Sequence, residues 1–156
     1  MNHEKNLRHE VRGVIEPLMF HLAGIPSYLV VAELALGQVL TGDLPHPGYP
    51  PLLRERAPQI WWDRAGHLFD YASCNYATRS QLAQCVGMVV QATSCAAHAV
   101  LATRGEWITN EKSLFARADL LELDQILATP ESTATRFNEI VRLARDLCLV
   151  RLTTTG

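Results

Sequence analysis

The sequence predicts a mainly α-helical fold, an antiparallel helical bundle preceded by one short N-terminal strand. Apolar residues make up 48% of its 156 residues, which is enough for the core of one domain. Apolar side chains recur three and four positions apart along several segments, as they do on one face of a helix. Glycine and proline lie at the ends of these segments, where helices begin and end.

The N-terminal part of the chain has a pattern of its own. We expect residues 1–44 to form a separate segment and residues 45–156 to form the bundle. The apolar residues 14–23 are compatible with a strand or a helix. Because Pro17 and Gly24 disfavour a long helix, a strand is predicted here.

An apolar helix is predicted next. It begins at Pro26, because proline suits the first turn of a helix, where its missing N–H is not needed. We expect it to run to Leu40 and to stop at Gly42. The helix is apolar nearly all round, so it should be buried or lie at an interface. Glu33 is a lone carboxylate on it; burial would mark a site, but a surface position is the simpler interpretation.

A proline-rich loop and a long helix follow. Residues 43–51 hold four of the eight prolines and should form an exposed loop. A short helix is expected at residues 52–57, and Pro58 should restart the chain as a longer helix to about Tyr76. The apolar positions of that helix follow one face: Trp61, Ala65, Leu68, Phe69, Ala72 and Tyr76.

The clearest helix is predicted from Arg79 to Arg104. Thr78 and Gln81 have the spacing of a capping box at its start, and Gly105 is a good stop just past its end. The segment contains no Asp or Glu, and its two terminal arginines are its only charges. We therefore expect the central helix of the bundle.

Three further helices complete the prediction. A short helix is expected at residues 111–117, and Asp119 can cap a second one that ends at residue 128. Thr129 followed by Pro130 gives a strong start for the final helix. The apolar face of that helix comprises Phe137, Ile140, Val141, Ala144, Leu147 and Cys148.

The charge balance argues against nucleic acid as a partner. The chain has 14 basic and 16 acidic residues, and its sequence shows no stripe of Lys and Arg. Its four cysteines form no C-x-x-C pair, so a structural zinc site is not expected. They lie among apolar residues, and we expect them to pack as free thiols in the reducing cytoplasm.

No membrane segment or signal peptide is expected. Residues 1–12 are polar and of mixed charge, unlike a signal peptide. The most apolar stretch, residues 25–40, contains Glu33 and Gln38 and is shorter than the ~20 residues that a membrane-spanning helix needs.

A polar line on the predicted central helix is one candidate binding site. Gln84, Gln91 and His98 recur every seven residues on an otherwise apolar helix. They could line a ligand pocket between helices. The simpler interpretation is that they are buried polar residues satisfied by their neighbours.

The segment of residues 104–112 is the second candidate site. Trp107 could stack on a base, Asn110 could contact a ligand through its amide, and Lys112 could hold a phosphate. Arg104 and Glu111 add charges of both signs. From the residues alone, helix capping and surface ion pairs are the favoured interpretation of the segment.

Several catalytic motifs are absent from the sequence. It has no phosphate-binding glycine loop of the Walker or G-x-G-x-x-G type. It shows no Ser–His–Asp pattern. No arginine is followed by a histidine after four to six intervening residues, which argues against a helical ribonuclease.

The segment RGEWITNEKSLFARADL, residues 104–120, resembles a segment of bacterial nucleotidyltransferase-domain proteins. In their C-terminal helical region this segment follows the pattern RGEW(x)xNEK…L. The similarity covers roughly residues 24–120 and includes residues 24–28, 32–37, 85–88 and 96–99. The region is similar to the HEPN class of nucleotide-binding helical bundles, which often accompany a minimal nucleotidyltransferase domain, fused or as a separate chain.

The resemblance implies a catalytic partner that this chain lacks. Such enzymes carry a Gly-Ser motif and an Asp-x-Asp pair that binds Mg²⁺ for transfer from a nucleoside triphosphate. The sequence contains neither motif, so no cofactor is expected in this chain itself. On this view residues 1–24 are a remnant of the last strand of the catalytic domain.

The resemblance also implies a role. A non-catalytic helical domain would bind the acceptor substrate or close the active site of a catalytic partner, with Arg104, Trp107, Asn110 and Lys112 lining the cleft. The apolar helix at residues 26–40 would then contact that partner or a second copy of the chain. The alternative is a stand-alone regulatory bundle that binds a small molecule.

Overall fold

The computed structural model describes residues 29–128 and 133–154, and these residues contain helices and no strand. The chain divides into two compact units, residues 1–47 and residues 48–156. The predicted mainly α-helical bundle is therefore confirmed. The strand predicted at residues 14–23 lies outside the described residues.

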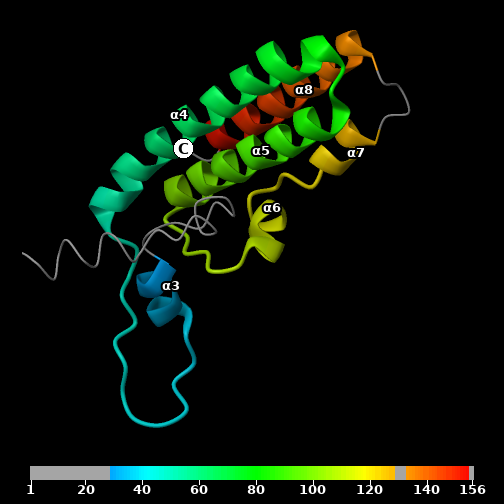
Figure 1. Cartoon of the computed structure of the whole chain (residues 1–156). Coiled ribbons are helices and arrows are strands. Elements are labelled where there is room, and N and C mark those ends of the chain that lie inside the picture. The colour runs from blue at the N-terminus through cyan, green and yellow to red at the C-terminus, as the bar shows by residue number, and fades with distance from the viewer. Residues whose placement is uncertain (1–28, 129–132, 155–156) are drawn as a thin grey trace, which may run out of the picture. The chain divides into compact units, whose positions relative to one another are not determined.

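The described part of the first unit contains one helix, α3 (Leu29–Leu36), drawn in blue in Figure 1. Its predicted end at Leu40 is wrong, because the helix ends before Gly37. Glycine loses more conformational freedom in a helix than any other residue, so the chain leaves the helix there rather than at Gly42. The His46 ring lies against the last turn, with 3.3 Å between its Nδ1 and the Ala35 carbonyl oxygen.

Most apolar side chains of α3 are exposed or only partly buried. Ala32 is its one buried residue, whereas Val30 is 79% exposed and Leu36 is 52% exposed. The expected burial is therefore wrong for the described residues, and the expected interface stays a prediction. Glu33 is exposed, as its interpretation as a surface residue requires.

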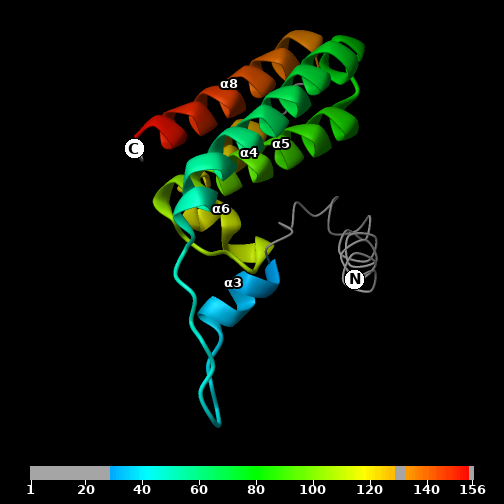
Figure 2. The same cartoon turned by 90° about the vertical axis from the view of Figure 1, so that its left-hand side faces the viewer.

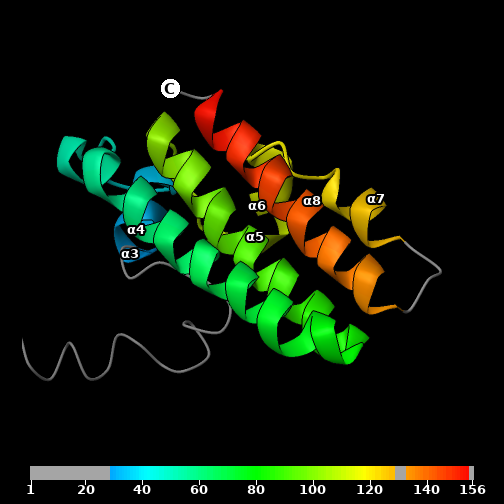
Figure 3. The same cartoon turned by 90° about the horizontal axis from the view of Figure 1, so that it is seen from above.

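Three long helices form the second unit: α4 (Pro51–Tyr71), α5 (Leu82–Arg104) and α8 (Ala134–Thr153). They lie side by side when viewed from two perpendicular directions (Figures 1 and 2). Seen from above, α5 lies next to both α4 and α8 (Figure 3). Its second half is almost completely buried, which confirms that it is the central helix.

The helices do not all alternate in direction. α4 and α5 are antiparallel, whereas α8 runs in the same direction as α5 (Figure 1). Ser73, just after α4, donates to Asn138 near the start of α8, with 2.7 Å between the two oxygens. The segment between α5 and α8 carries the chain back along the bundle, which allows the parallel arrangement.

The prediction that Pro58 restarts a helix is wrong, because α4 continues through it. A proline inside a helix removes one backbone hydrogen bond. Ala57 and Trp61, on either side, are both buried against the rest of the bundle. Packing of this face holds the helix together, since most helical stability in proteins comes from tertiary contacts.

The predicted capping box at the start of α5 is also wrong. α4 continues as a π-helical turn, Ala72–Tyr76, and a 3-10 turn, Ala77–Arg79. Ser80 then takes a left-handed conformation with φ of 53° and ends these helical turns. The Thr78 hydroxyl donates back to the Cys74 carbonyl, so Thr78 belongs to the preceding helical turns and does not cap α5.

The predicted stop at Gly105 is confirmed. Gly105 has φ of 70°, and its N–H and that of Glu106 donate to the carbonyls of Ala102 and Leu101. This is a Schellman motif, which favours glycine at the left-handed position.

Three short helical elements follow α5: a 3-10 turn, Glu111–Ser113, then α6 (Leu114–Arg117) and α7 (Leu123–Leu127). Asp119 was expected to cap a helix, and this is wrong. It ends α6 in a left-handed conformation with φ of 58°. For α8 the Thr133 hydroxyl accepts from the Arg136 N–H, and the predicted start at Thr129 and Pro130 lies outside the described residues.

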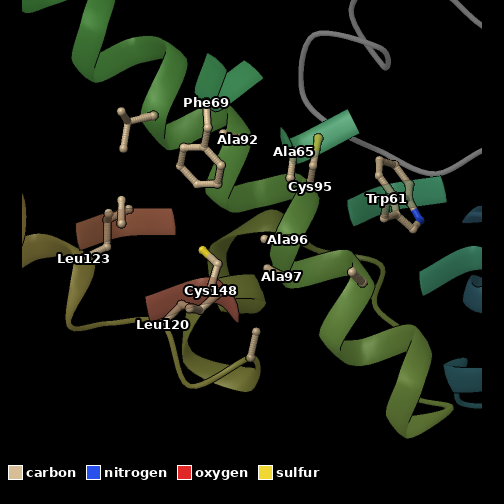
Figure 4. Close-up of a cluster of buried hydrophobic side chains, with 14 of the residues drawn as sticks. Trp61, Ala65, Phe69, Ala92, Cys95, Ala96, Ala97, Leu120, Leu123 and Cys148 are labelled. Carbon is tan, nitrogen blue, oxygen red and sulfur yellow. The ribbon is translucent and has the colours of Figure 1, made fainter. Parts of the chain in front are cut away.

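The core lies between the three long helices and the short ones (Figure 4). Small residues on α5, among them Ala92, Ala96 and Ala97, bring the helices close together. The predicted faces of α4 and α8 supply Phe69, Phe137 and other buried side chains, which confirms both faces. Cys85, Cys95 and Cys148 are buried free thiols, as expected, and Cys74 is exposed.

Candidate functional site

The segment of residues 104–112 lies at the C-terminal end of α5. Trp107 is only 7% exposed, and its ring contacts the ring of Tyr49 with 4.6 Å between centroids. Trp107 is therefore part of the packed interior. A ligand cannot stack on it without a rearrangement of this segment.

Asn110 supports the local backbone. Its Oδ1 accepts a hydrogen bond of 2.7 Å from the N–H of Lys112, which caps the 3-10 turn that follows. Glu111 and Lys112 are exposed on that turn. Asn110 is exposed as well, although its side-chain oxygen is engaged in this cap.

Arg104, the last residue of α5, reaches across to the end of α6. Its Nη1 donates to the Arg117 carbonyl oxygen at 2.6 Å, and its Nη2 pairs with Asp119 Oδ2 at 2.8 Å. The last carbonyls of a helix lack partners within the helix, and an arginine is well suited to bind them.

Arg117 reaches in the opposite direction. It donates to the Trp107 carbonyl at 2.6 Å and pairs with Glu106 Oε2 at 2.8 Å. The side chains of Arg104 and Arg117 therefore hold the start of the segment that follows α5 against the end of α6. The helix-capping and ion-pair interpretation accounts for most polar residues of this segment.

A third arginine extends this network from α8. Arg151 Nε donates to the Asp119 carbonyl oxygen at 2.9 Å, and its Nη2 forms an ion pair with Glu122. Asp119 is thus held by Arg104 through its side chain and by Arg151 through its backbone. These contacts join α5, α6 and α8 at one end of the bundle.

The ends of these three helices and the turn after α6 border an open pocket of about 710 Å³. Its volume lies in the range that small-molecule sites occupy. It is lined by two arginines, two carboxylates and three smaller or apolar residues: Arg104, Arg151, Asp119, Glu122, Ala116, Leu121 and Thr154. We call it the C-terminal pocket, because it lies at the C-terminal ends of α5, α6 and α8.

The predicted polar line on α5 does not reach this pocket. Gln84 is exposed, Gln91 is half-buried and His98 is 5% exposed, so the three residues lie in different environments. The His98 ring stacks on Trp61, with 4.7 Å between centroids and 23° between planes. Its surroundings are those of a packed core histidine.

No group of three or more His, Cys, Asp or Glu side chains that could hold a metal occurs in the described part of the chain. Burial raises the pKa of the Cys95 thiol to about 11 and that of the Cys148 thiol to about 12. The described buried thiols therefore stay protonated at neutral pH and are poor nucleophiles.

Among the charged residues that line the pocket, only Arg104 was predicted from the sequence as a binding residue. Asp119 was assigned a capping role, although it belongs to the segment that carries the resemblance. Glu122 and Arg151 were not considered. No local pattern marks them, because the pocket forms only when the end of α8 meets the connection after α5.

α5 is long and apolar enough to cross a membrane by length and composition, with a mean hydropathy of 1.6. In the fold 67% of that stretch is buried, as in the core helix of a bundle. This stretch, rather than residues 25–40, is therefore the one that meets the length and composition of a membrane span among the described residues.

Comparisons with protein-family models, curated proteins and solved structures gave no match to this chain.

Proposed function

We propose that this chain is the non-catalytic helical domain of a nucleotidyltransferase-type protein and that it binds the acceptor substrate for a catalytic partner. One observation carries the proposal. The segment that resembles such proteins, residues 104–120, supplies Arg104, Ala116 and Asp119 to the wall of the C-terminal pocket. The resemblance and the pocket thus coincide.

The proposal divides the roles of the predicted residues. Arg104 faces the pocket, whereas Trp107 and Asn110 are positioning residues that hold the segment in place. Glu111 and Lys112, which are exposed, remain available to a partner, and Lys112 could also bind the phosphates of its nucleotide. Gln91 and His98 have no part in this site.

The partner supplies the chemistry. Its aspartates would bind Mg²⁺ and the nucleoside triphosphate, since the sequence of this chain has no Asp-x-Asp pair. The exposed apolar side chains of α3, Val30, Val31 and Leu36, support a docking role for that helix, towards the catalytic domain or a second copy.

The proposed compartment is the cytoplasm. The buried cysteines are free thiols, and thiols stay reduced there.

Co-expression tests the proposal. The tagged chain is expressed with nucleotidyltransferase domains from the same genome that carry the Gly-Ser and Asp-x-Asp motifs. We expect a stable complex by light scattering, and pyrophosphate release that Arg104→Ala lowers. Arg142→Ala is the control, because Arg142 pairs with Asp146 on α8 and lies outside the pocket. If no such domain associates with the chain, the proposal is wrong.

The same pocket supports a second candidate function, a stand-alone bundle that binds a small regulatory molecule. Ligand binding by the chain alone, with no complex formed in the co-expression experiment, would favour this alternative.

A further inference from the structure

The C-terminal pocket presents carboxylate oxygens more openly than guanidinium groups. Asp119 and Glu122 are 62% and 60% exposed, whereas Arg104 and Arg151 are 23% and 26% exposed. Each carboxylate pairs with its arginine through one oxygen, Oδ2 of Asp119 and Oε1 of Glu122. The other oxygen of each makes no hydrogen bond to a described residue.

The arginines are occupied on their side of the pocket. Arg104 donates to the Arg117 carbonyl as well as to Asp119, and Arg151 donates to the Asp119 carbonyl as well as to Glu122. An anionic ligand would compete with these oxygens for guanidinium groups that are the less exposed partner of each ion pair. A ligand with N–H donors would instead bind the second oxygen of each carboxylate and leave both ion pairs intact.

The ends of the helices shift the balance of charge further. The pocket is lined by the last residue of α5, by Ala116 and Asp119 around the end of α6, and by Arg151 and Thr154 at the end of α8. A helix carries a partial negative charge at its C-terminus. Two guanidinium and two carboxylate groups balance one another, so the ends of the two long helices, α5 and α8, favour a cation over an anion here.

The remaining lining indicates the shape of the ligand. Ala116 and Leu121 provide apolar surface, and Leu121 is 59% exposed. A ligand that places methylene groups on these side chains and ammonium groups on the carboxylates would match the whole wall.

We propose that the C-terminal pocket binds an organic cation, an aliphatic amine with at least two ammonium groups, anchored by Asp119 and Glu122. The inference deepens the proposed function and rests on it in taking this pocket as the acceptor site. The acceptor class is then amine-bearing small molecules.

Calorimetric titration of the full chain with spermidine at low salt tests the inference. We expect saturable binding with one site per chain. The double variant Asp119→Asn, Glu122→Gln should weaken it by about tenfold, the loss expected for two exposed ion pairs. Asparagine is the substitution of choice at Asp119, because it tolerates the positive φ there.

A matched control separates this pocket from general charge. The variant Glu139→Gln, Asp146→Asn removes the same two charges from α8, where these carboxylates pair with Arg136 and Arg142. It should bind spermidine like the unmodified chain. Circular dichroism checks folding, and Glu122→Gln alone replaces the double variant if that variant unfolds.

Three results would overturn the inference: no binding of spermidine, an equal loss in the control variant, or binding of inorganic phosphate in its place. The titration uses the chain alone. Its failure therefore leaves the association with a catalytic domain untouched, and failure of that association leaves the titration result standing.

Discussion

Arg104 and Asp119 form an ion pair between the end of α5 and the residue that ends α6, with 2.8 Å between Nη2 and Oδ2. The same arginine holds the Arg117 carbonyl at 2.6 Å. One side chain thus sets the path of the connection and forms part of a pocket wall. The structural role and the proposed binding role meet at this residue and have to be separated by experiment.

Replacement of Arg104 by leucine should lower the free energy of unfolding by about 1.5–3 kcal/mol, the range for a hydrogen bond from a charged group. The pair with the exposed Asp119 should add little, because solvent screens it. Urea unfolding measures the change. Lys112→Ala, on the exposed turn, should stay within about 0.5 kcal/mol of the unmodified chain. Equal effects of the two would contradict the capping role of Arg104.

Trp107→Ala should be more damaging, with a loss of about 3–5 kcal/mol, because it removes a buried ring that packs on Tyr49. Thermal and urea unfolding measure this loss. A variant that keeps its stability and loses only ligand binding would show that Trp107 is a stacking face for a ligand after all.

Two left-handed positions should respond in opposite ways. Ser80→Gly should stabilise the chain by about 0.5–1 kcal/mol, because glycine reaches positive φ without steric cost. Gly105→Ala should destabilise the chain by about 1 kcal/mol, because alanine reaches positive φ only at a steric cost. The new Cβ would lie 3.5 Å from Arg54, an ordinary contact, so no clash adds to this cost. Gly87→Ala, inside α5 with open space around it, is the control and should stabilise. Unfolding midpoints that place Gly105→Ala above the unmodified chain would contradict the assigned geometry.

The buried thiols make stability fall at alkaline pH. Unfolded cysteines ionise near pH 9, whereas burial raises the pKa of Cys95 to about 11 and of Cys148 to about 12. The unfolded state therefore binds fewer protons than the native state above pH 9, and each group lowers stability by up to about 1.4 kcal/mol per pH unit until its native pKa is reached.

Urea unfolding at pH 8, 9 and 10 measures this slope. Cys148→Ala should reduce it, and Cys74→Ala, at an exposed position, should leave it unchanged. An equal slope in Cys148→Ala and the unmodified chain would argue against a buried thiol.

Features with a local cause could be predicted from the sequence. The end of α5 was predicted at Gly105, because a left-handed position favours glycine. The buried face of α8 was predicted from spacing alone, and residues such as Phe137 and Ile140 lie where it placed them. Both signals lie within a few residues of the feature that they mark.

Features that depend on distant packing could not be predicted. Pro58 looked like a boundary, yet burial of Ala57 and Trp61 carries α4 through it. Asp119 looked like a cap, yet its partners are Arg104 and Arg151, which come from other helices. A polar residue near a turn has several possible partners, and only the fold selects among them.

Only part of the candidate site could be predicted, because its residues come from distant parts of the sequence. The segment beginning at Arg104 was singled out, and that residue does line a pocket. Arg151 joins it from the far end of the sequence, and no periodicity or motif links the two positions.

The measurement to make first is pyrophosphate release by the purified chain alone, with Mg²⁺ and each of the four nucleoside triphosphates. Because we propose that this chain binds and that a partner carries out the chemistry, we expect no turnover in a preparation that binds spermidine. Turnover above that of a Lys112→Ala control would mean that the chain contains a catalytic centre, and the proposed division of roles would be wrong.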